Sequence, residues 1–76
     1  MTMTEAVQKR IEELCWERHI SINKLSELSG INQSTLSNIV RGRNKSTTIC
    51  TLHKICKGLG ITVDEFFRDE VFEEVE

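Results

Sequence analysis

The tightest constraint in this sequence is the three-residue connection Ser29-Gly30-Ile31, which joins two short stretches with helical periodicity. Glycine tolerates the left-handed conformation that commonly follows a helix end, so Gly30 predicts where the first helix stops. Asn32 is a favourable N-cap for the next helix. Because the connection is so short, the two helices must cross steeply, as in a helix-turn-helix.

The spacing of apolar residues predicts five short helices and no strand, which makes the fold all-α. The first covers about residues 4–18, the second 21–29, and the third runs from its cap at 32 to Gly42. The fourth covers about 48–59, and the fifth opens at Thr62. The residues expected to face the core are Val7, Ile11, Leu14, Cys15, Ile22, Leu25, Leu28, Ile31, Leu36, Ile39, Val40, Ile49, Leu52, Ile55, Cys56, Leu59 and Phe66.

Capping residues support these helix starts. Thr2 or Thr4 can cap the first helix and Ser21 the second. Thr62 and Glu65 have capping-box spacing, and Ile61 can pack on Phe66 as a hydrophobic staple. Trp16 lies beside the first apolar stripe and is expected to be partly buried.

Charge is unevenly distributed along the 76 residues, although the net charge is only −2. Residues 28–63 contain no acid and five bases, whereas residues 64–76 contain seven acids and one base. A central block without acids is the part of the chain that a polyanion would approach.

The three cysteines do not indicate a disulfide framework or a metal site. Their number is odd, and the N-terminus lacks the pattern of a signal peptide, so we expect a cytoplasmic protein with reduced thiols. Cys50 and Cys56 are six residues apart, which directs them about 120° apart on a helix. We therefore expect no metal and no cofactor. We also predict no membrane span, and no catalytic set is present that would indicate an enzyme.

The predicted third helix has an exposed face suited to reading DNA. Leu36 and Ile39 point inward, which leaves polar side chains outward; these are Gln33, Ser34, Ser37 and Asn38. Glutamine and asparagine can pair with adenine through two hydrogen bonds, and serine can donate or accept. Beyond this helix, Arg41, Arg43 and Lys45 are predicted to contact phosphates, as are Thr47 and Thr48 at the start of the fourth helix.

These segments resemble the lambda-repressor-like, Cro/C1-type (XRE) helix-turn-helix proteins of phages and bacteria. The resemblance is carried by residues 25–31, 34–39, 41–42, 51–61 and 62–67, in order and at family spacing. It implies a compact five-helix domain and a transcriptional regulator that binds specific sequences of double-stranded DNA, with repression as the expected role. By position, the resemblance also implies phosphate contacts from Ser21 and Asn23.

The sequence departs from the family pattern at one pair of buried positions. Many members place arginine at the position of Cys15 and glutamate at that of Val40, where they form an ion pair. Replacing both partners of a buried pair with apolar groups can be neutral or stabilising. We therefore hypothesise that Cys15 packs directly on Val40.

The chain is divided into a DNA-binding domain over residues 1–67 and an acidic tail over 68–76 that could extend the last helix. Phe67, Val71 and Val75, with Phe72 beside them, could pack on a second subunit, because helix-turn-helix proteins usually bind paired half-sites as dimers. Alternatively, the tail could fray in solvent. A rival function is an antitoxin or another protein-interaction module that uses this tail to bind a protein partner.

Overall fold

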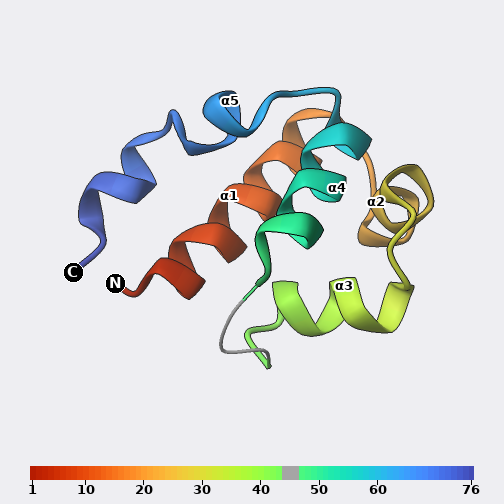
Figure 1. Ribbon diagram of the computed structural model, residues 1–76, viewed down its shortest axis with the longest axis horizontal. Coiled ribbons are helices and arrows are strands. Elements are labelled where there is room, and N and C mark those ends of the chain that lie inside the picture. Colours follow the sequence, from red (N-terminus) through yellow and green to blue (C-terminus); the bar gives the residue numbers. More distant parts are fainter. Residues whose placement is uncertain (44–46) are drawn as a thin grey trace.

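Residues 1–43 and 47–76, the parts that the computed structural model describes, form five α-helices and a short 3-10 helix (Figure 1). The all-α prediction is confirmed, and the described ranges contain no strand. The helices are α1 (Met3–Glu17), α2 (Ile22–Ser29), α3 (Gln33–Val40), α4 (Ile49–Leu59) and α5 (Val63–Phe67), followed by η1 (Glu70–Glu74). No helix in these ranges is long and apolar enough to cross a membrane.

Hydroxyl and amide side chains start the helices much as the sequence predicts. Thr2, rather than Thr4, caps α1 and forms a capping box with Glu5. The predicted box between Thr62 and Glu65 is present at α5. The caps of α2, α3 and α4 are Ser21, Asn32 and Thr48. Each cap satisfies a backbone N–H that the helix itself leaves without a partner.

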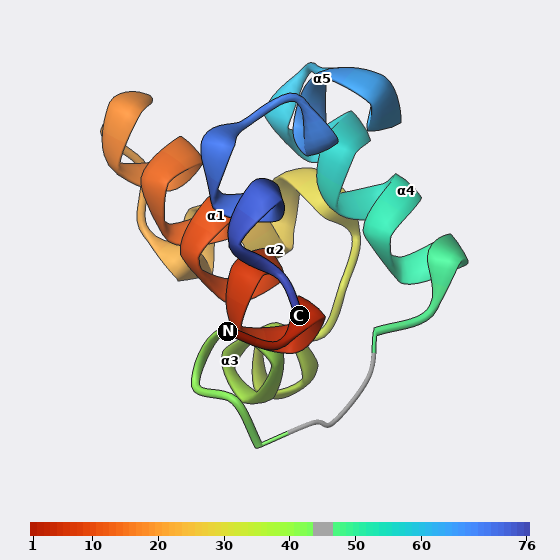
Figure 2. The same cartoon turned by 90° about the vertical axis from the view of Figure 1, so that its left-hand side faces the viewer.

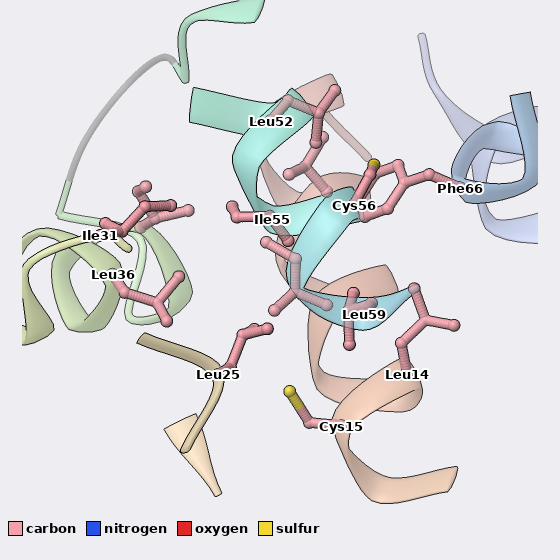
Figure 3. Close-up of a cluster of buried hydrophobic side chains, with 13 residues drawn as sticks. Leu14, Cys15, Leu25, Ile31, Leu36, Leu52, Ile55, Cys56, Leu59 and Phe66 are labelled. Carbon is pink, nitrogen blue, oxygen red and sulfur yellow. The ribbon is translucent and has the colours of Figure 1, made fainter. Parts of the chain in front are cut away.

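The core lies where α1, α2, α3 and α4 converge (Figure 3). Its fully buried side chains include Ile11, Leu25, Leu36, Ile55 and Phe66. Burial raises the pKa of the Cys15 and Cys56 thiols, so both remain protonated and behave as small apolar side chains. Cys50 is exposed, so it and Cys56 face different surroundings on α4.

Three residues predicted to be buried or partly buried are instead exposed. Leu28 is 50% exposed because α2 turns a neighbouring face, centred on Ser29, toward the core. A Cβ added at Gly58 of α4 would lie only 2.9 Å from the Ser29 backbone nitrogen, which shows how closely α4 packs there. Ile49, 75% exposed, lies in the first turn of α4, which extends beyond the core. Trp16, 78% exposed, lies about 100° around α1 from the buried Cys15.

The acidic C-terminal segment folds back onto α1 instead of continuing α5. Arg10 of α1 donates from Nε to the Phe66 carbonyl oxygen at 2.7 Å and from Nη2 to that of Glu65 at 2.9 Å. Its Nη1 lies 3.2 Å from Oδ2 of Asp69, which also caps η1. Val71 is buried within the chain itself, so it is not available to a second subunit. The division at residue 67 stays a prediction.

The proposed contact between Cys15 and Val40 also stays a prediction. Cys15 is buried and Val40 is half-buried, and both line one hollow. We expect Val40→Glu to lower the free energy of unfolding by about 1–2 kcal/mol, because its carboxylate would enter this partly apolar site without the family's arginine. Urea unfolding followed by circular dichroism measures the change, and unchanged stability would refute the hypothesis.

Candidate nucleic-acid interface

A sharp turn between α2 and α3 determines the direction of α3. Gly30 ends α2 with φ of 70°, a left-handed conformation that side-chain-bearing residues adopt less readily. The backbone N–H of the next residue, Ile31, donates to the Ser26 carbonyl oxygen at 3.2 Å, and its side chain is buried. In Figure 1, α3 lies along one edge of the molecule and α5 lies at the opposite edge.

The two faces of α3 differ sharply in character. Leu36 and Ile39 anchor its inner face in the core. Gln33 and Ser34 are exposed on its first turn, while Ser37 and Asn38 are half-buried on its second. The backbone N–H of Ser34 donates to Oδ1 of Asn32 at 2.8 Å, so Asn32 serves as the cap. All four predicted base-reading residues therefore lie on a helix whose orientation is fixed by packing.

A shallow hollow joins part of this helix to the start of α2. It is lined by Ile22, Asn23, Gln33, Ser37, Val40 and Arg41. It thus brings together two predicted base-reading residues with two predicted phosphate contacts. Ser34 and Asn38 do not line it. Ile22 was expected only in the core, yet it contributes an apolar wall here while packing partly against the core.

The predicted phosphate contacts occupy several places on the surface. Arg41 and Arg43 are exposed just after α3, and Lys45 lies outside the described residues. Ser21 accepts a hydrogen bond from the Lys24 backbone N–H and Thr48 accepts one from that of Thr51.

Each cap satisfies only one of the backbone N–H groups in the first turn of α2 or α4. The other N–H groups of that turn can bind an anion such as a phosphate. Thr47 is half-buried and lines a different hollow, beside Met3 and Ile49.

Most of the candidate interface, from α3 to the start of α4, lies in the part of the sequence that lacks acids. Between Leu28 and Val63 the chain contains five basic residues and no acidic one. The acids of the C-terminal segment belong to α5, η1 and their flanks, and Asp69 is paired with Arg10. A polyanion at α3 would therefore avoid the most acidic part of the chain. An exposed polar helix face beside arginines and a helix-turn-helix backbone define a DNA-binding protein.

Comparison with known proteins identifies the family. Residues 10–71 match the family model of the Cro/C1-type helix-turn-helix DNA-binding domain. The chain is 34% identical over 71 residues to the SPbeta prophage-derived HTH-type transcriptional regulator YopS of Bacillus subtilis, covering 93% of this chain and 96% of YopS. The chain belongs to the Cro/C1-type family of helix-turn-helix transcriptional regulators.

Other similarities agree with this assignment. The HTH-type transcriptional regulator PuuR of Escherichia coli is 34% identical over 61 residues, which cover 80% of this chain and 32% of PuuR. The prophage Lp1 protein 11 has a solved structure with 39% identity and a TM-score of 0.83, covering 99% of both chains. The wild-type restriction-modification controller protein C.Esp1396I shares the fold, with a TM-score of 0.85 at 24% identity over 97% of this chain and 92% of that one.

Proposed function

We propose that this regulator is a repressor that binds paired DNA half-sites as a homodimer. Each copy would place α3 in a major groove, with Gln33, Ser34, Ser37 and Asn38 toward the base edges. The observation that carries the proposal is the polar outer face of α3, held by Leu36 and Ile39 beneath it. Action on chromosomal DNA would place the protein in the cytoplasm.

Phosphate contacts would supply much of the affinity, because the chain as a whole is slightly acidic. Arg41 and Arg43 flank the reading face, and the starts of α2 and α4 offer backbone N–H groups. Each neutralised phosphate releases counterions, so the log of the binding constant should fall by about 0.9 per phosphate for each log unit of salt. A mobility-shift titration on the DNA upstream of the gene at several salt concentrations tests this. Salt-independent binding, or none, would contradict the proposal.

An exposed apolar surface near the C-terminal end of α3 offers a place for the second copy. Ile49 is 75% exposed and Met3 is 51% exposed. They border a hollow whose other lining residues are Thr4, Val7, Thr47, Leu52 and Phe67. Figure 2 shows the first turn of α1 on the end of the molecule that faces the viewer, with the start of α4 to one side.

The form of this surface suits a two-fold dimer. A projecting isoleucine beside an apolar hollow allows each copy to fill the other's hollow. Paired half-sites would then require the two α3 helices of the dimer to lie about one DNA turn apart, ~34 Å.

Ile49→Asp is expected to weaken the dimer and lower the apparent affinity for paired half-sites by about 10-fold or more, since a carboxylate would replace a buried apolar contact. Sedimentation equilibrium measures the mass and mobility shift measures the affinity. Leu28→Asp is the matched control, because Leu28 is also an exposed apolar residue but lies on α2. If both variants dimerise like the parent, this surface is not the interface.

The rival proposal of an antitoxin retains one supporting feature. A hollow on the C-terminal segment is lined by Glu13, Phe67, Arg68, Asp69, Glu70, Phe72 and Glu73, so acids and aromatic rings meet there. A protein partner encoded beside the gene could bind that hollow. Co-purification with the product of a neighbouring toxin-sized reading frame would favour this rival, and a salt-sensitive shift of upstream DNA without any partner would favour the repressor.

A further inference from the structure

Trp16 occupies an unusual position for the single tryptophan of a small protein. It lies in the last full turn of α1 and is 78% exposed. A large aromatic side chain contributes more to stability when it is buried than when it is left in water. Tryptophan is also the residue type most enriched among the energetic centres of protein interfaces. Its exposure therefore suggests that a partner covers it.

Two adjoining hollows meet at this tryptophan. One is lined by Trp16 with Glu12, Glu13 and Glu17. The other is mainly apolar, and its lining residues are Glu12, Cys15, Trp16, Ile20, Ser21, Ile22 and Val40. Within the described ranges, none of the three glutamates of the first hollow forms an ion pair. The surface thus combines an aromatic centre, an apolar floor and an unpaired acidic rim.

The charges of this surface select the kind of partner. DNA would be repelled by Glu12, Glu13 and Glu17. A second copy related by a two-fold axis through Trp16 would bring these same glutamates against each other, which is also unfavourable. A cationic segment with an apolar side chain avoids both kinds of repulsion. Its arginine could lie over the indole and pair with a carboxylate, while its apolar side chain fills the floor.

We propose that Trp16 is the centre of a docking surface for a basic, apolar segment of another protein. The surface lies beside the candidate DNA interface, because Ile22 and Val40 line both its apolar hollow and the hollow that contains Gln33. A protein bound to adjacent DNA would approach from that side, and DNA-binding proteins carry the required positive charge. The docking itself does not require DNA, so it can be tested even if the proposed operator binding fails.

A synthetic helical peptide with leucines along one face and arginines beside them serves as the probe. Trp16 reports directly on its own site, since no other tryptophan contributes to the emission. On binding, the emission should shift to shorter wavelength as the indole leaves water. Anisotropy of a labelled peptide gives the affinity. Trp16→Ala and the double variant Glu12→Gln/Glu17→Gln should each bind at least ~10-fold more weakly, while circular dichroism stays unchanged.

The matched control neutralises two acids elsewhere. Glu74→Gln/Glu76→Gln removes the same charge from two exposed positions that line no hollow with Trp16 or the three glutamates, and it should change the affinity by less than about 2-fold, because exposed charges outside the site are screened by salt. The proposal is overturned if Trp16→Ala binds the peptide as well as the parent, or if the two double variants lose equal affinity. It is also overturned if a peptide with serines in place of the leucines binds equally well.

Discussion

Arg10→Leu is expected to lower the free energy of unfolding by about 3 kcal/mol, a large share of the 5–15 kcal/mol typical of a small domain. The guanidinium is largely buried and donates to the Phe66 and Glu65 carbonyl oxygens as well as to Asp69. Leucine would leave these three acceptors without a donor in a site that water reaches poorly. Urea unfolding followed by far-ultraviolet circular dichroism measures the loss at a fixed protein concentration.

Two controls distinguish this network from general effects of charge. Lys9→Leu removes a cation from the exposed neighbouring position of α1 and should change stability by less than about 0.5 kcal/mol. Asp69→Asn keeps an oxygen that can accept the Val71 N–H and should cost less than Arg10→Leu. Equal stability of Arg10→Leu and Lys9→Leu would show that Arg10 does not hold the C-terminal segment on α1.

Gln33→Ala should change which DNA sequences are bound, whereas Arg43→Ala should weaken all of them alike. Loss of a two-pronged contact to a base removes about 1–3 kcal/mol of discrimination at one position of each half-site. Loss of a phosphate contact removes affinity without altering preference, and should reduce the salt slope by about 0.9. Binding to a panel of single-base operator variants at two salt concentrations separates the two effects.

The contrast between the variants is the informative result, because each serves as the control for the other. Both side chains are exposed, so neither substitution should disturb the fold. If Arg43→Ala altered the sequence preference while Gln33→Ala left it intact, the docking face would have to be placed elsewhere. If both variants kept the affinity and specificity of the parent, α3 would not be the reading helix.

Local signals in the sequence predict most of the backbone of this fold. A cap such as Ser21, a capping box such as Thr62 with Glu65, and a left-handed glycine such as Gly30 all act within a few residues. They place the helix starts and the short turn before α3 correctly. The polar outer face of α3 could also be predicted, since Leu36 and Ile39 determine which side is buried.

Features that depend on distant contacts could not be predicted in the same way. The partners of Arg10 are 55 to 59 residues away, and no local pattern indicates them. Apolar spacing also predicts a buried Leu28 and Ile49, but burial depends on which neighbouring helix covers each position. Trp16 was expected to be packed, yet its helical position already turns it away from the stripe that contains Leu14.

Selection of bound sequences from a random pool of double-stranded DNA tests the central claim most directly. A two-fold symmetric dimer that reads through α3 predicts a palindromic motif with half-sites about one helical turn apart, centre to centre. Gln33→Ala, carried through the same selection, should lose preference at one symmetric pair of positions. The claim would be contradicted if the parent protein enriched no motif. It would also be contradicted if the motif of the parent protein stayed unchanged in all four variants, Gln33→Ala, Ser34→Ala, Ser37→Ala and Asn38→Ala.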